Sequence, residues 1–170
     1  MRWKLSTTLI VALLLPACQS LPRQEDVLPA AVGEQWQLLR SLHFPPGSTR
    51  LHFQDGRQTA AMKLTVWELN CAFVLDRASD EAIDIEPGPL RVSAVRRREA
   101  FGVWERGSIA YQTVIHFDDA HHPLVALDCE RWVQGYDARY RLHRAELRQL
   151  LRGWLGIPSA RPSGGGESQR

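Results

Sequence analysis

The sequence lacks the local motifs that mark the common catalytic and nucleotide-binding sites. Its 170 residues contain no GxSxG elbow, no HExxH zinc motif, no GxxxxGK[ST] phosphate loop, no EF-hand loop and no GxGxxG turn. Catalytic groups can converge from distant strands without a local motif, so a hydrolase stays open as a hypothesis. We therefore assign no catalytic residue and expect no cofactor.

The chain also has little excess charge and no long hydrophobic run. With 21 Lys and Arg against 19 Asp and Glu, its formal net charge is +2, too small to gather nucleic acid, which we do not expect as a partner. The longest apolar stretch, LSTTLIVALLLPA at 5–17, is shorter than the roughly 20 residues of a transmembrane helix. It follows Arg2 and Lys4, as the apolar region of a secretory signal peptide does.

The residues that end this stretch carry a recognisable pattern. Leu15 stands three positions before Cys18, and the small residue Ala17 directly precedes it. The first eighteen residues resemble the signal of a bacterial lipoprotein precursor, which implies a lipid (diacylglycerol and an acyl chain such as palmitate) on Cys18. By the same resemblance Gln19 favours the outer membrane, with the domain facing the periplasm. The alternative is an ordinary secreted protein whose cysteine falls there by chance.

Only two cysteines follow Cys18, and neither belongs to a CxxC pair. Cys71 and Cys129 lie in apolar segments whose alternation points both side chains inward. In an oxidising periplasm such residues are expected to form a disulfide, whereas in the cytosol they would be two buried thiols. The chain-entropy model gives this bridge about 4 kcal/mol of stabilisation.

Composition divides the chain into four parts. We expect a signal peptide at 1–17, a lipid-attached tether at 18–29, a single globular domain at 30–157 and a disordered tail at 158–170. Without Arg2 and Lys4 the mature chain is formally neutral, with 19 basic and 19 acidic residues.

Apolar spacing predicts a helix at each end of the domain and strands between them. The N-terminal helix would start after Pro29 and present Val32, Trp36, Leu39 and His43 on one face. The C-terminal helix, 137–156, would carry Tyr140, His143, Leu147, Leu151 and Trp154 on one stripe.

The middle of the chain alternates with period two. Asp55 and Gly56 predict a hairpin, and a shift of apolar phase near Val66 and Trp67 predicts a bulge in the next strand. We therefore expect an α+β fold, an antiparallel sheet or partly open barrel of about five to six strands with an N-terminal and a C-terminal helix. Trp67, Trp104 and Trp132 could line a ligand groove, but one tryptophan per strand is what a modest core needs, and we expect them in the core.

Two clusters are candidates for binding. Imidazoles and carboxylates crowd one short loop and could hold zinc, or could simply form a solvated turn: His116, Asp118, Asp119, His121 and His122. A basic stripe on the C-terminal helix could face an anionic lipid or polymer, or could be an ordinary solvated face: Arg141, Arg144, Arg148 and Arg152.

These observations support three functional hypotheses. The first is an outer-membrane lipoprotein with a structural, accessory or binding role towards another envelope component, either a protein or an anionic polymer. The second is a periplasmic module that binds a small molecule or metal. The third is a hydrolase without a local motif.

Overall fold

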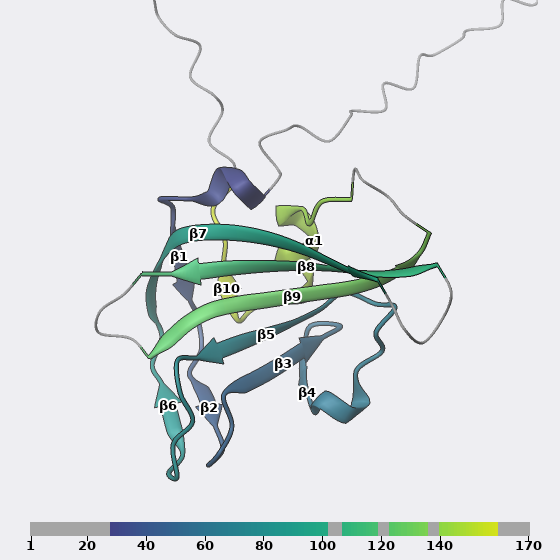
Figure 1. Ribbon diagram of the computed structural model, residues 1–170. Helices are drawn as coiled ribbons and strands as arrows, with labels where there is room; N and C mark the ends of the chain where they lie inside the picture. The colour runs from purple at the N-terminus through teal and green to yellow at the C-terminus, as the bar shows by residue number, and fades with distance from the viewer. Residues whose placement is uncertain (1–27, 102–106, 119–122, 136–139, 160–170) are drawn as a thin grey trace, which may run out of the picture.

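The computed structural model describes residues 28–101, 107–118, 123–135 and 140–159 (Figure 1). In these parts the chain folds mostly into strands. The elements are β1 (Gln35–Leu38), β2 (Leu42–Phe44), β3 (Arg50–Gln54), β4 (Arg57–Thr59), β5 (Asn70–Leu75), β6 (Ile83–Ile85), β7 (Gly88–Phe101), β8 (Ser108–Phe117), β9 (Leu124–Gln134), β10 (Leu155–Gly156), the helix α1 (Arg144–Leu150) and short 3-10 helices at Leu28–Ala31 and Ala61–Lys63.

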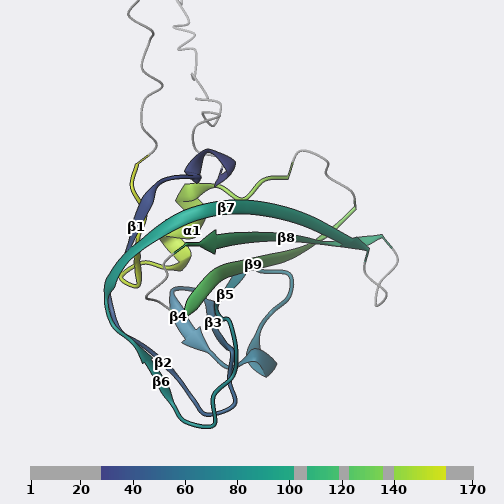
Figure 2. The ribbon, with the colours of Figure 1, turned by 60° about the vertical axis from the view of Figure 1, so that its left-hand side comes forward.

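Eight of the strands form one antiparallel sheet in the order β10-β1-β7-β8-β9-β5-β3-β4. β2 and β6 form a separate two-stranded sheet. The large sheet curls into half a barrel, and α1 lies on its inner side (Figures 1 and 2). The α+β class expected from the sequence is therefore wrong, because the domain is a mostly β half-barrel with more strands and a single α-helix in the described residues.

Strict alternation explains the inner face of this sheet. On β8 the odd-numbered residues from Ile109 to Phe117 are all buried, whereas Gln112, Val114 and His116 are only partly covered. Cys71 and Cys129 are directly paired between β5 and β9 and form a disulfide in the core, which confirms the predicted bridge. The Asp55–Gly56 hairpin is also confirmed, since both residues have the positive φ that a two-residue turn requires.

The expected N-terminal helix is wrong. Only Leu28–Ala31 form a 3-10 turn, and the chain then enters β1, in which Trp36 and Leu38 are buried while Gln35 and Gln37 are exposed. Val32 and Leu39, assigned to the apolar helix face, are exposed instead. A few apolar residues three or four positions apart fit both periods, and here period two prevails because β7 and β10 supply hydrogen-bond partners to β1.

The expected C-terminal helix is shorter than its apolar stripe suggests. α1 covers Arg144–Leu150 and begins after His143, whose backbone N–H donates to the Glu146 carboxylate at 3.1 Å; Gly153 follows the helix at a positive φ. The next residues form β10 on the edge of the sheet. The bulge expected near Val66 and Trp67 is also wrong, because residues 64–69 form a loop before β5 begins.

Candidate functional site

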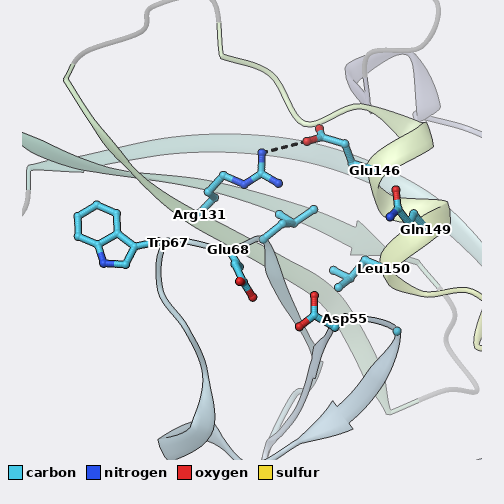
Figure 3. Close-up of a pocket in the computed structure, with 9 residues that line it drawn as sticks. Asp55, Trp67, Glu68, Arg131, Glu146, Gln149 and Leu150 are labelled. Carbon is cyan, nitrogen blue, oxygen red and sulfur yellow. Dashed lines mark hydrogen bonds and ion pairs between the residues drawn. The ribbon is translucent and has the colours of Figure 1, made fainter.

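A groove of about 570 Å³ opens between α1, the end of β9 and two loops of the sheet (Figure 3). The β3–β4 turn forms one wall, and the residues that precede β5 form another. The lining consists of Asp55, Gly56, Trp67, Glu68, Leu69, Arg131, Glu146, Gln149 and Leu150.

The loop that carries Trp67 is held in place by backbone hydrogen bonds. The buried side chain of Gln54 donates to the Thr65 carbonyl over 2.7 Å and accepts from the Thr65 N–H over 2.9 Å. The Val66 carbonyl accepts from the Trp132 N–H of β9 at 2.9 Å. The backbone beside Trp67 is therefore fixed, yet 40 % of Trp67 remains exposed.

Arg131 closes the inner side of the groove and is itself well supported. Its guanidinium donates to a Glu146 carboxylate oxygen over 3.0 Å and lies over the Tyr140 ring, 5.8 Å from its centroid. Tyr140 packs against Tyr111 with ring centroids 4.8 Å apart. Burial raises the pKa of Tyr140, with Arg131 acting in the opposite direction. The positive charge of the groove is thus fixed and largely satisfied by protein groups.

Among the described residues, two of the three carboxylates of the groove lack the protein partners that Arg131 has. Asp55 and Glu68 are exposed and, within the described part of the chain, their carboxylates have no hydrogen-bond or ion-pair partner. Figure 3 shows both side chains reaching into the space below Arg131. With three carboxylates and one guanidinium, the lining carries a formal charge of −2. The groove therefore offers hydrogen-bond acceptors, negative charge and one aromatic face.

The metal cluster expected near the end of β8 is only partly described. His116 is half-buried on the outer face of the sheet, and Asp118 follows the strand and is exposed. Asp119, His121 and His122 lie outside the described residues. Across the four described ranges, no group of three or more His, Cys, Asp or Glu side chains is placed to hold a metal ion.

The four arginines of the expected basic stripe do not share one solvated face. Arg144 is buried and its guanidinium pairs with both oxygens of Glu34 at 2.5 and 2.8 Å. Arg148 donates to the Ile157 and Pro158 carbonyls, and Arg141 to the Tyr140 carbonyl. Arg152 is exposed.

The tryptophans also depart from expectation. Trp132 is half-buried and donates to Glu130, Trp67 stands exposed on the groove, and Trp104 lies outside the described residues. Placing Trp67 in the core was wrong, because the segment that precedes Leu69 is a loop rather than a strand. The one feature of the sequence that indicated this loop is the loss of regular alternation between Leu64 and Leu69. From the sequence alone we interpret that loss as a bulge within a strand.

In the described ranges, no helix combines the length and hydrophobicity needed to cross a bilayer. Comparison of the chain with protein-family models, with curated proteins and with solved structures finds no match.

Proposed function

We propose that this chain is a lipid-anchored protein of the bacterial envelope and that its half-barrel binds another envelope component in the groove beside Trp67. The observation that carries the binding role is Trp67, an aromatic side chain left exposed on a backbone held by hydrogen bonds from Gln54 and Trp132. A large apolar side chain kept at the surface on a fixed backbone is a common feature of interaction sites.

The lining of the groove favours binding over catalysis by a hydroxyl, thiol, imidazole or amine nucleophile. None of its nine residues is Ser, Thr, Cys, His or Lys. What it provides are carboxylate and amide groups, an aromatic face and an apolar floor of Leu69 and Leu150. Groups of these kinds bind a ligand or partner through hydrogen bonds and apolar contacts.

The location rests on two independent features of the chain. The first is the resemblance of residues 1–18 to a lipoprotein signal. The second is the Cys71–Cys129 disulfide, which suits an oxidising compartment. The described chain starts at Leu28, at the end of the domain remote from the η3 helix (Ala61–Lys63) that precedes Trp67 (Figures 1 and 2). Lipid on Cys18 would therefore join the domain at the end opposite the Trp67 loop.

Metabolic labelling with palmitate tests the anchor. The intact chain should incorporate label and sediment with the outer membrane, and Cys18→Ser should abolish both. If the Cys18→Ser protein is still labelled and still sediments with that membrane, the anchor is misassigned.

Photo-crosslinking in intact cells tests the groove. A crosslinking amino acid at exposed Gln149, which lines the groove, should give discrete adducts with an envelope component. The control position is exposed Arg96, on the outer face of the sheet. Adducts that are no stronger at position 149 than at position 96 would refute the proposed site.

A further inference from the structure

We propose that the groove and the adjoining loop dock a basic segment of another protein, with one Arg or Lys side chain over Trp67 and others against the carboxylates of Asp55 and Glu68 (Figure 3). This inference rests on the proposed function, because it takes the groove as the binding site and names the chemistry of its partner. The docking surface consists of Met62, Val66, Trp67, Asp55 and Glu68.

The apolar part of the docking surface is concentrated in one short loop. Among the described residues, five large hydrophobic side chains are exposed, and three of them lie between positions 62 and 67: Met62 at 92 %, Val66 at 43 % and Trp67 at 40 %. Methionine adapts its shape to a partner, and tryptophan is the residue most enriched at the centre of interfaces. A cluster of this kind indicates a covered surface.

The fixed backbone makes this exposure a property of the fold. Thr65 is bound through both its N–H and its C=O by the side chain of Gln54, and Glu68 N–H donates to the Thr65 carbonyl at 3.1 Å, which closes a turn. These bonds fix the backbone that carries Trp67 at the surface of the domain. A partner would meet a surface that is already ordered, which lowers the entropic cost of binding.

The negative charge beside these apolar side chains favours a positively charged partner. The groove lining has a net charge of −2, and Asp55 and Glu68 are its two carboxylates without a protein partner in the described residues. Basic side chains of the partner can donate charge-assisted hydrogen bonds to the carboxylates and make a cation–π contact with the indole. An acidic segment would be repelled, and so would the anionic lipids of a bilayer surface.

The shape of the groove favours a protein segment over a small molecule. Pockets that hold small ligands usually enclose most of the ligand surface. Trp67, which lines this groove, is exposed, and the exposed Val66 and Met62 lie in the same loop of the chain. A peptide with apolar and basic side chains can cover both parts at once.

Peptide binding to the full chain in detergent micelles tests the inference. Three peptides of equal length, in which leucine alternates with arginine, glutamate or glutamine, serve as probes for calorimetry. The arginine peptide should bind, and the affinity should fall steeply with added salt, whereas the other two should not bind measurably.

Variants of the carboxylates give the decisive comparison. Asp55→Asn with Glu68→Gln should weaken arginine-peptide binding by about tenfold or more. The substitutions are nearly isosteric, and asparagine tolerates the positive φ of position 55. The matched control, Asp80→Asn with Glu81→Gln, removes the same charge from exposed positions between β5 and β6 and should leave binding unchanged.

Two further variants separate the aromatic contact from the ordering of the loop. Trp67→Leu keeps an apolar side chain but removes the π face, and should weaken binding of the arginine peptide by several-fold. Gln54→Leu removes both hydrogen bonds to Thr65 and should lower affinity without touching the peptide, which would identify Gln54 as a positioning residue.

The outcomes are distinguishable. Equal binding of the glutamine or glutamate peptide, or no effect of the double carboxylate variant, would overturn the inference. So would cosedimentation of the lipid-free Cys18→Ser protein with vesicles of phosphatidylethanolamine and phosphatidylglycerol that Trp67→Leu abolishes. If position 149 crosslinks in cells while the arginine peptide fails to bind, the chemistry assigned here is wrong and the binding site stands. If position 149 does not crosslink above its control, the proposed function itself fails.

Discussion

The ion pair between Glu34 and Arg144 should be the most costly polar contact to break in this domain. Glu34 precedes β1 and Arg144 is the first residue of α1, so the pair joins the helix to the N-terminal side of the sheet. Arg144 is 1 % exposed and Glu34 15 % exposed. Both guanidinium nitrogens reach the carboxylate, which also accepts from the Trp36 indole at 3.1 Å.

The cost depends on which partner is removed. Glu34→Gln removes the carboxylate that pairs with a buried guanidinium, which typically costs about 3 to 5 kcal/mol of unfolding free energy. Arg144→Met leaves a carboxylate that water can reach, so we expect a smaller loss of about 1 to 3 kcal/mol. The double variant should lose less than the sum of the two, because neither charge is then left alone.

Urea denaturation and thermal unfolding measure these differences. For a domain of this size, the loss in Glu34→Gln corresponds to a Tm lower by about 6 to 20 °C. Arg152→Gln, which removes an exposed arginine just after the same helix, is the control and should change stability by less than about 0.5 kcal/mol. A loss below about 1 kcal/mol in Glu34→Gln, or strict additivity in the double variant, would refute the account of a buried pair.

Two further predictions concern the disulfide and pH. Replacing Cys71 and Cys129 together by alanine should cost about 4 kcal/mol, because the bridge closes a span of 58 residues; reductant should then have no further effect on urea unfolding of the variant. Burial is the main cause that lowers the pKa of His52 from 6.5, followed by the nearby Arg50, so the folded state favours the neutral ring. Stability from this group is therefore complete above about pH 6.5 and is lost as the pH falls towards the lowered pKa, and His52→Asn should make urea midpoints flatter over that range. An unchanged pH dependence in His52→Asn would contradict this assignment.

Local patterns in the sequence were sufficient where one face of a strand is buried. The alternation from Ile109 to Phe117 predicted the inner face of β8, and the same logic placed Cys71 and Cys129 inward on separate strands. Asp55–Gly56 predicted the hairpin between β3 and β4, because few residues other than glycine, asparagine and aspartate adopt a positive φ.

Short segments with mixed spacing fit more than one secondary structure. Trp36 can belong to a helical stripe with Val32 and Leu39 or to an alternating pair with Leu38, and only hydrogen bonds from β7 and β10 decide in favour of the strand. By its spacing Arg144 belongs to a regular basic stripe. In the structure it is buried instead, where it forms an ion pair with Glu34, 110 residues earlier in the chain.

The sequence by itself determined the inward phase of the long strands, the partners of the disulfide and the turn at Asp55. Tertiary structure alone decided that the N-terminal segment is a strand, that the last helix has only seven residues, and that Trp67 stands at the surface on the same groove as Asp55, Glu68 and Arg131. The physical reason is distance along the chain. Periodicity reports which side of a segment is buried, but the groove and the buried ion pair depend on contacts between residues that only the curled sheet brings together.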